Sequence, residues 1–233
     1  MTTQEILETG AQNIILATGA TWQQNGMGRT LRKPIRGYDL QNVFNPDDLM
    51  EKNMESRSLL LDNRQQAVGL QNFIIYDDDH YYMGGVLAEL LAEQGCQVSL
   101  VTPAPMISYW SQFTLEQERI QQKLMRLGVK LYPQHILGVI EDDCVTLINR
   151  ISGEGMELSR DGVLLVSDRV SNDSLYYELK PAQEEGSIRS LRVIGDAEAP
   201  NIIAQAVFSG HLAAREFEEE KGEGTPFKVE RIM

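Results

Sequence analysis

The fold class of this chain is decided by the stretch Phe73-Ile74-Ile75-Tyr76-Asp77-Asp78-Asp79. Its first four residues form an apolar run typical of a buried strand, and three carboxylates follow directly. Residues 84–94 then place leucines on one face of a predicted helix, which ends at Gly95. Residues 98–101 are the next apolar run. A strand, a helix and a second strand in this order predict a βαβ unit in a parallel sheet.

The same alternation of strands and helices extends along the whole chain. Residues 13–19 read as a buried strand that ends on a glycine. Thr114 and Gln117 have the spacing of a capping box, which predicts a helix that Gly128 ends. Further strands are predicted over residues 129–132, 136–140, 145–148, 163–166 and 191–194, a short helix over 47–51, and a final helix over 201–219. The sequence therefore predicts an α/β fold.

Length and composition restrict the classes of function. The 233 residues suffice for one large or two small domains. A formal net charge of −13 argues against nucleic acid or an anionic membrane surface as a partner. No apolar run is long enough to span a bilayer and no signal peptide is recognisable, so a cytoplasmic location is expected. Cys96 and Cys144 are too few for an iron–sulfur cluster and are interpreted as small packing groups.

Dinucleotide binding requires a tight GxGxxG turn that lets backbone amides approach a pyrophosphate. The pairs Gly26/Gly28, Gly153/Gly155 and Gly222/Gly224 have the first spacing, but none is completed by a third glycine. Residues 77–79 stand where the turn would lie, and their carboxylates would repel a pyrophosphate by about 1 kcal/mol per contact even in water. Thr102 stands where an acidic residue for the ribose is expected. The sequence therefore predicts no NAD(H) binding in this unit.

Other candidate sites have weaker patterns. Asp77, Asp79 and His80 have a spacing that carboxylate metal ligands use, but no calcium-loop glycine accompanies them, and a solvated acidic loop is the favoured interpretation. His135 and His211 lack a nucleophile pattern and are interpreted as structural or surface residues. No catalytic residue and no metal site are predicted. Core packing is favoured over a partner-facing role for four aromatic residues, Tyr81, Tyr82, Tyr109 and Trp110.

Several stretches resemble the trimethylamine, dimethylamine and histamine dehydrogenase family. They are residues 15–22, 81–83, 109–116, 194–200 and 208–211. The resemblance covers nearly the whole chain, and its most specific part is Ile194-Gly195-Asp196-Ala197-Glu198-Ala199-Pro200. In that family an N-terminal barrel carries FMN and an iron–sulfur cluster. Two glutathione-reductase-type domains follow it, one inserted into the other.

The resemblance implies nested Rossmann-like, three-layer dinucleotide-binding folds, of which the outer one is incomplete. Residues 1–36 and 170–233 would be a partial FAD- or ADP-type domain, and residues 37–169 an inserted NAD-type domain with a degenerate phosphate loop. It also implies cofactor contacts at two strand ends, where an aspartate would accept a hydrogen bond from a ribose or ribityl hydroxyl. A helix N-terminus after Pro200 would face the phosphates. The implied cofactor-binding residues are Thr18, Gly19, Gly195 and Asp196.

In functional terms, the resemblance implies the C-terminal part of an FMN/iron–sulfur amine dehydrogenase, an oxidoreductase and flavoprotein. The chain would complete a nucleotide-binding region and support assembly, and would be inactive alone. FAD or ADP would bind in the intact enzyme, whereas FMN and the cluster belong to the N-terminal part. The partners would be that barrel region, or a subunit carrying it, and an electron-transfer flavoprotein.

Two alternatives come from other classes of protein. One is a freestanding interaction module, derived from such an enzyme, that docks an electron carrier. The other is a small NAD(P)H oxidoreductase, and the missing glycines count against it.

Overall fold

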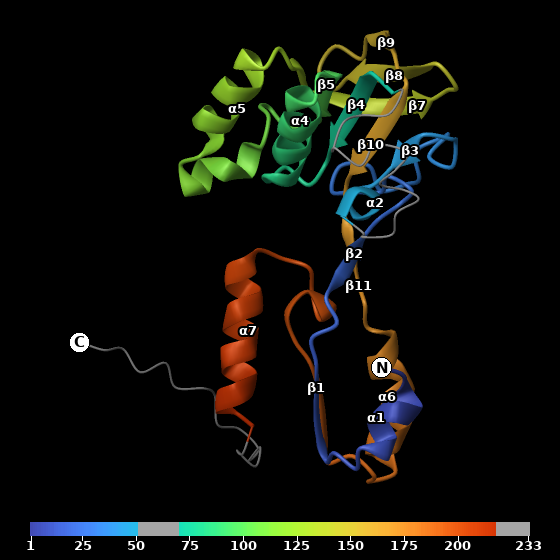
Figure 1. Cartoon of the computed structure of the whole chain (residues 1–233), viewed down its shortest axis with the longest axis vertical. Coiled ribbons are helices and arrows are strands. Elements are labelled where there is room, and N and C mark those ends of the chain that lie inside the picture. Colours follow the sequence, from blue (N-terminus) through green and yellow to red (C-terminus); the bar gives the residue numbers. More distant parts are fainter. Residues whose placement is uncertain (51–69, 218–233) are drawn as a thin grey trace, which may run out of the picture. The chain divides into compact units, whose positions relative to one another are not determined.

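The computed structural model describes residues 1–50 and 70–217, and the chain forms two compact units (Figure 1). Unit 1 is Met1–Ala20 with Ser171–Met233, and unit 2 is Thr21–Val170. The chain passes from unit 1 to unit 2 within β2 (Ala20–Trp22) and returns within β11 (Arg169–Ser171). These two strands pair with each other. Within the described residues, none of the helices is both long and apolar enough to cross a lipid bilayer.

Unit 2 is built on a five-stranded parallel sheet with the strand order β3-β10-β4-β5-β6. The central strand β4 contains the apolar run that opened the sequence analysis, and Ile74 pairs with Val163 on one side and Ser99 on the other. The strands are β3 (Val43–Phe44), β4 (Asn72–Asp77), β5 (Gln97–Thr102), β6 (Lys130–Pro133) and β10 (Gly162–Val166). The predicted α/β fold with a parallel sheet is confirmed.

A layer of helices covers one face of this sheet, and a small antiparallel sheet covers the other (Figure 1). Because successive strand residues point to opposite faces, Phe73 and Ile75 pack with the helices, whereas Ile74 and Tyr76 pack with the antiparallel sheet. The helices of unit 2 are α2 (Pro46–Met50), α4 (Met83–Glu93), η1 (Tyr109–Thr114) and α5 (Gln117–Arg126). The antiparallel strands are β7 (His135–Ile140), β8 (Cys144–Asn149) and β9 (Gly155–Ser159).

Unit 1 contains a parallel sheet of only two strands, β1 and β12, among the residues described. Ile14 and Leu16 of β1 point toward α1 and α6 and form a small core with Leu179 and Leu191. On the opposite face α7 is loosely packed, and Ala213 is its only buried residue. The elements are α1 (Thr3–Glu8), β1 (Asn13–Leu16), α6 (Ser174–Glu184), β12 (Ser190–Val193), η2 (Gly195–Ala197) and α7 (Ile203–Arg215).

Several local details depart from the sequence-based expectations. The capping box predicted from Thr114 and Gln117 is wrong: Glu116 is the N-cap of α5, and its carboxylate accepts a hydrogen bond from Thr114 Oγ1 at 2.6 Å. Residues 109–114 form the 3₁₀ helix η1 instead, so the helix starts later. The sequence analysis did not identify α1, α6 or β9. In addition, residues 21–36 pack with unit 2, because Ile35 inserts into its core.

Gly37 provides a test of the packing of unit 2. Its φ is 87°, and a Cβ atom there would lie 2.1 Å from the carbonyl oxygen of Ile140. Gly153 has a φ of 75° with no atom within 4 Å of such a Cβ. We expect Gly37→Ala to lower the free energy of unfolding by more than about 3 kcal/mol and Gly153→Ala by about 1 kcal/mol, since only the first adds a backbone clash to the strain. Urea denaturation measures both, and equal losses would contradict this packing.

Candidate functional site

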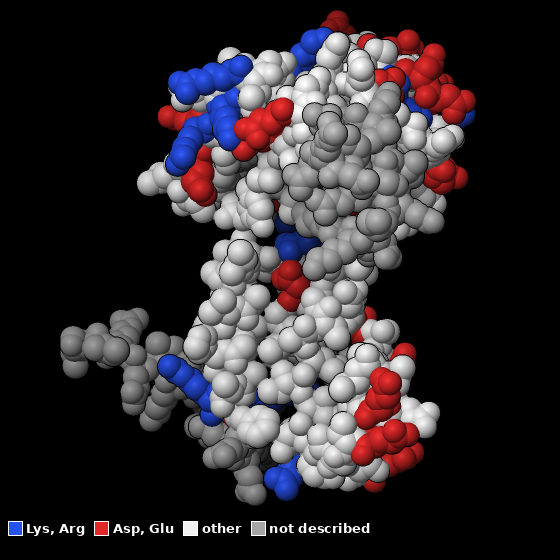
Figure 2. Space-filling view, in the orientation of Figure 1, with Lys and Arg blue, Asp and Glu red and all other residues white. Residues whose placement is uncertain are grey.

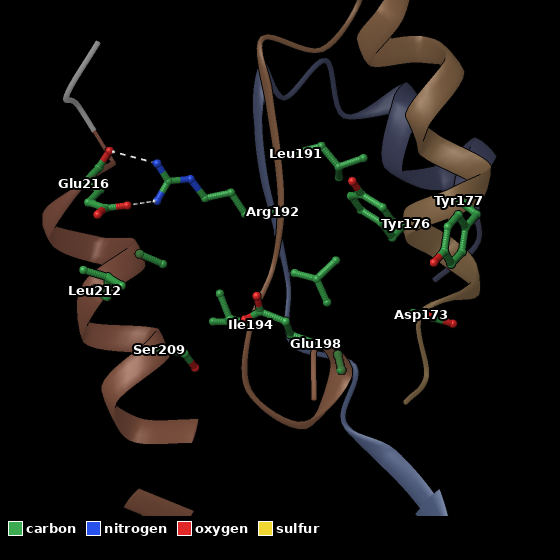
Figure 3. Close-up of a pocket in the computed structure, with 13 residues that line it drawn as sticks. Asp173, Tyr176, Tyr177, Leu191, Arg192, Ile194, Glu198, Ser209, Leu212 and Glu216 are labelled. Carbon is green, nitrogen blue, oxygen red and sulfur yellow. Dashed lines mark hydrogen bonds and ion pairs between the residues drawn. The ribbon is translucent and has the colours of Figure 1, made fainter. Parts of the chain in front are cut away.

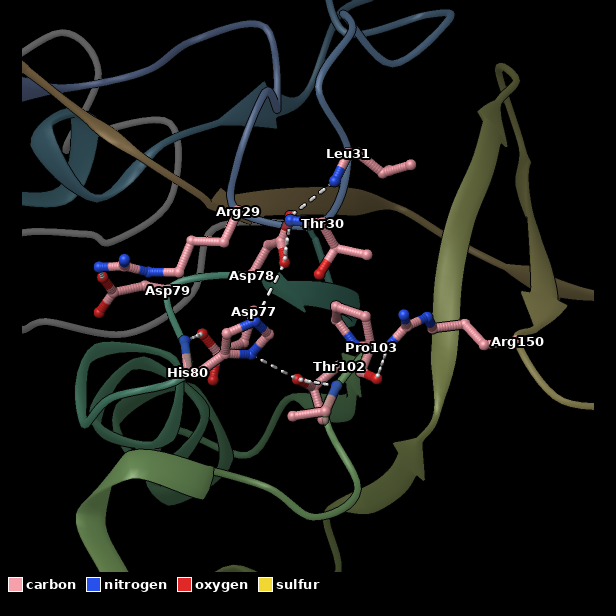
Figure 4. Close-up of polar contacts among 11 residues, drawn as sticks. Arg29, Thr30, Leu31, Asp77, Asp78, Asp79, His80, Thr102, Pro103 and Arg150 are labelled. Atoms are coloured by element: carbon pink, nitrogen blue, oxygen red, sulfur yellow. Dashed lines mark hydrogen bonds and ion pairs between the residues drawn. The ribbon is translucent and has the colours of Figure 1, made fainter. Parts of the chain in front are cut away.

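The loop Asp77–His80 links β4 to α4 at the carboxyl end of the parallel sheet, where α/β folds bind their ligands. Asp77 and Asp78 are fully buried and Asp79 is 8% exposed. The interpretation of this loop as solvated is therefore wrong. The physical reason is a second segment, residues 26–36, which folds over the loop and removes it from water (Figure 4).

Asp78 is the centre of this arrangement. Its carboxylate accepts hydrogen bonds from the backbone amides of Thr30 at 2.9 Å and Leu31 at 3.1 Å, and His80 Nε2 lies 3.2 Å from Oδ1 (Figure 4). A Cβ atom on Gly28 would come within 2.5 Å of Asp78 Oδ2, so glycine permits this close approach. Burial opposes ionisation, but the hydrogen bonds from His80, Thr30 and Leu31 hold the pKa of Asp78 below its usual value. The carboxylate thus occupies a nest of amides of the kind that binds anions.

Asp77 lies against the N-terminus of α4. A Cβ atom on Gly84, in the first turn of α4, would be 2.7 Å from Asp77 Cγ. Asp77 Oδ1 accepts a hydrogen bond from the backbone amide of His80 at 3.0 Å, while Oδ2 is buried without a partner among the described residues. Burial, followed by repulsion from Asp79, raises the pKa of Asp77 to about 7, and the opposing effect of His80 is smaller.

Asp79 faces the segment that covers the loop. Arg29 Nη2 lies 3.8 Å from Asp79 Oδ1, and the guanidinium also lies 4.2 Å from the centre of the Trp110 ring. Burial, with a contribution from Asp168, raises the pKa of Asp79 even though Arg169 and Arg29 favour its charged form. Arg29 therefore joins the acidic loop to η1.

Together these contacts fill the place of a phosphate loop with the protein's own atoms. In a dinucleotide site, the pyrophosphate rests against bare backbone at a helix N-terminus. In unit 2 the Asp77 carboxyl occupies that position, and residues 28–31 lie over the neighbouring Asp78. Thr102, which replaces the expected ribose-binding acid, is fully buried, and its Oγ1 accepts a hydrogen bond from the amide of Ala104 at 3.2 Å.

The four predicted cofactor-binding residues lie close together in unit 1. Leu16 pairs with Val193, so the chain segments that follow β1 and β12 leave the sheet side by side. Gly19 and Gly195 both have positive φ, 75° and 63°, and a Cβ atom on either would have no neighbour closer than 3.6 Å. Space therefore exists at the strand ends.

The partners of these residues are local. Thr18 Oγ1 donates a hydrogen bond to the carbonyl oxygen of Asn172. The Gly195 amide donates to Ser209 Oγ at 2.9 Å, and Asp196 Oδ1 accepts from the amide of Asn201 at 3.1 Å. The bonds of Gly195 and Asp196 fix the turn between β12 and α7. They are also what a plain strand terminus would form, so the geometry alone assigns no ligand.

A cavity of about 450 Å³ lies beside β12 in unit 1 (Figure 3). Arg192 crosses toward α7 and forms an ion pair with Glu216, with 2.8 Å between Nη1 and Oε2. Tyr176 and Tyr177 of α6 line the opposite side. The four predicted cofactor-binding residues are not among those that line this cavity.

The remaining candidates from the sequence have mixed outcomes. His135 Nδ1 contacts the carbonyl oxygen of Pro133 at 2.7 Å, which is a structural role, and His211 is exposed. Cys96 packs beside the main core, but Cys144 is hydrogen-bonded to Glu141, which raises its pKa to about 11, so its interpretation as a packing group is wrong. Within residues 1–50 and 70–217, no three His, Cys, Asp or Glu side chains are grouped so that they could hold a metal ion.

The aromatic residues differ from the favoured interpretation. Tyr82 and Trp110 are exposed, and Tyr81 and Tyr109 are only half-buried, so core packing is the wrong interpretation for this group. Sequence reasoning also missed Arg29 and the segment that covers Asp78. The spacing of Gly26 and Gly28 was the available signal, because two nearby glycines often mark a close backbone approach.

Comparisons with known proteins agree with this geometry. A family described as the OYE-like second alpha/beta domain matches residues 61–178. The chain belongs to this family. The match covers most of unit 2, including the acidic loop and the parallel sheet.

Three longer proteins resemble nearly the whole chain. Dimethylamine dehydrogenase of Hyphomicrobium sp. (strain x) is 35% identical over 94% of this chain and 31% of its own length. The structure of histamine dehydrogenase from Rhizobium sp. 4-9 has a TM-score of 0.86 and 32% identity over 100% of this chain and 33% of that one. The structure of 6-hydroxypseudooxynicotine amine oxidase from Pseudomonas geniculata N1 has a TM-score of 0.85 and 30% identity over 94% and 31%. This member of the OYE-like family thus spans about a third of the length of these relatives.

Asp77 is expected to make stability depend on pH. Because its pKa is raised in the folded protein from 3.8 to about 7, its contribution is fully present below the pKa of the unfolded chain and is lost as the pH rises through about 7. Asp77→Asn removes this loss. The free energy of unfolding of the variant, relative to that of the wild type, should therefore rise between pH 4 and pH 8 by up to about 4 kcal/mol. Urea denaturation at both pH values measures this difference in unfolding free energy. A difference that does not change with pH would contradict the burial of the Asp77 carboxyl.

Asp78 is expected to hold the covering segment in place. Asp78→Ala leaves the partly buried amides of Thr30 and Leu31 without this acceptor and should lower the free energy of unfolding by about 3 kcal/mol. Asp161 is the matched control, because it also accepts two backbone amides, from Gln71 and Asn72, but is exposed. Since water can replace its carboxylate, Asp161→Ala should cost less than about 1 kcal/mol. Similar losses in the two variants would refute the central role of Asp78.

Proposed function

We propose that this chain is the C-terminal part of an amine dehydrogenase-type flavoprotein, in which it completes a nucleotide-binding region and supports assembly. The observation that carries the proposal is the two-stranded parallel sheet of unit 1. Parallel sheets are normally covered on both faces, and two strands are too few for independent stability. Among the described strands, β1 pairs only with β12. A further strand from outside this chain would complete the sheet.

Exposed apolar side chains of unit 1 support the same proposal. Ile15 of β1 points away from the small core, and Ile203, Val207 and Phe208 of α7 are all more than half exposed. Apolar groups gathered in this way mark a surface that another protein segment covers. The chain spans about a third of the relatives' length, so the longer proteins have ample sequence to provide that cover.

The nested arrangement implied by the sequence belongs to this proposal. Unit 1 would be the incomplete FAD- or ADP-type domain, and unit 2, which includes residues 21–36, would be the inserted NAD-type domain. The three layers of unit 2 support the second assignment. The open backbone at Gly19 and Gly195 fits a nucleotide, and the Asp196 carboxylate would accept a hydrogen bond from its ribose hydroxyl.

The chemistry of amine oxidation would lie outside this chain. FMN and the iron–sulfur cluster would be held by the barrel region, and an electron-transfer flavoprotein would accept the electrons. Unit 2 would bind no nicotinamide nucleotide, because the Asp77 carboxyl occupies the pyrophosphate position and the covering segment is held by Asp78. The chain alone would therefore oxidise no amine.

A full-length hybrid tests this function. In it, this chain replaces the aligned third of the Hyphomicrobium dimethylamine dehydrogenase. We expect the hybrid to assemble with ADP or FAD bound, and Asp196→Ala to weaken that binding by about tenfold through loss of a hydrogen bond to the ribose. Glu184→Ala, at the exposed C-terminal end of α6 in the same unit, should have no effect. Nucleotide released on denaturation and isothermal titration provide the measurements.

Two outcomes would contradict the proposal. A hybrid that fails to assemble, or that assembles without nucleotide, would show that this chain does not complete a nucleotide-binding region in such an enzyme. Saturable binding of NADH to the isolated chain would instead favour a small NAD(P)H oxidoreductase.

A further inference from the structure

The surface of unit 2 around η1 is apolar, aromatic and uncharged. Phe113 is 83% exposed and Leu115 is 93% exposed, and Trp110 and Tyr82 are also exposed. We define these four residues as the η1 surface. Residues 109–115 contain no charged side chain, although charged residues make up 24% of the whole chain. Full exposure of a phenylalanine and a leucine two residues apart has no benefit in the isolated unit.

The η1 surface is held in a fixed shape. The Trp110 amide donates a hydrogen bond to the carbonyl oxygen of His80 at 2.9 Å, and a Cβ atom on Gly85 would lie 3.1 Å from Ser108 Oγ. These contacts hold η1 beside the segment that carries Tyr82. The Arg29 guanidinium lies over the Trp110 ring, 4.2 Å from its centre, and so anchors the ring from the side of the acidic loop.

The backbone of η1 is strained at both ends. Ser108 and Leu115 have φ values of 49° and 62°, in the left-handed region that non-glycine residues avoid. A strained backbone that presents exposed apolar side chains is typical of a functional contact, because the strain persists only where something selects for it. The left-handed turn at Leu115 directs the chain from η1 into α5.

We propose that the η1 surface is a permanent docking site. Its occupant is the remaining part of a full-length protein as long as the relatives, which lies outside this chain. This inference rests on the proposed function. Permanent interfaces are apolar, rich in aromatic residues and depleted of charge at their centre, whereas transient docking surfaces are more polar. About two thirds of the length of each relative lies outside the aligned region and is available to cover this surface.

The charge distribution agrees with this occupant. Figure 2 shows Lys and Arg side chains over α5, with acidic side chains among them. The basic residues of α5, which follows η1 in the chain, are Arg119, Lys123 and Arg126. Lys123 is paired with Glu89 and Glu93 of α4. A transient partner, such as an electron carrier, is attracted by charged residues like those of α5. The uncharged η1 residues would contribute little to its rate of association. The part of the full-length protein that lies on the η1 surface should therefore offer apolar pockets for Phe113 and Leu115.

Cysteine labelling in the hybrid enzyme tests this docking site. Leu115→Cys is compared with Ile151→Cys, which places the probe at an apolar position 79% exposed on the β8–β9 turn. A maleimide reagent is used, and labelled peptides are identified by mass spectrometry so that Cys96 and Cys144 do not interfere. We expect both sites to react rapidly in the isolated chain. In the hybrid, Leu115→Cys should react at least about tenfold more slowly, while Ile151→Cys is unchanged.

The other outcomes are distinguishable. Equal labelling of Leu115→Cys in the isolated chain and in an assembled, nucleotide-containing hybrid would overturn the docking site but leave the proposed function intact. Protection that appears in the isolated chain only at high concentration would assign the surface to a second copy. Protection there at every concentration would mean that the chain covers the surface itself, and either result overturns the inference. A hybrid that does not assemble contradicts both proposals.

Discussion

The Asp78 carboxylate, with the backbone amides of Thr30 and Leu31 bound to it, organises the described part of unit 2 around the carboxyl end of its sheet. A buried charge is costly unless it is fully hydrogen-bonded, so the carboxylate and the covering segment require each other. The amides that could have met a ligand's phosphate meet an internal anion instead. The same interaction brings Arg29 over Trp110, which connects the closed site to the exposed η1 surface.

The two units differ in how far each satisfies its own requirements. Unit 2 has a five-stranded sheet covered on both faces and a ligand position filled by its own side chains. Unit 1 has two paired strands, a small core on one face and a loosely packed helix on the other. A closed unit joined to an open one suits the proposed role of this chain as a piece of a larger assembly, in which unit 2 would be a prefolded support. Membership of the OYE-like family and the length of the relatives agree with this division.

The closed site also shows why a shared fold does not by itself assign a ligand. A parallel sheet with a helix after its central strand creates the same position in every such fold. What binds there depends on whether the turn leaves the backbone bare. Here the turn carries Asp77 against Gly84, so the position is the same and its occupant is different.

The sequence by itself determined the α/β fold, because short continuous apolar runs and helices with a period of 3.6 residues are local patterns. It also determined that the turn after Tyr76 is acidic and lacks the glycine fingerprint. Only the tertiary structure decided that these carboxylates are buried, since residues 26–36 and 77–80 are about fifty positions apart and no local pattern pairs them. The same holds for Trp110 and Phe113: aromatic residues favour a core in general, and only the packing of η1 left them at the surface.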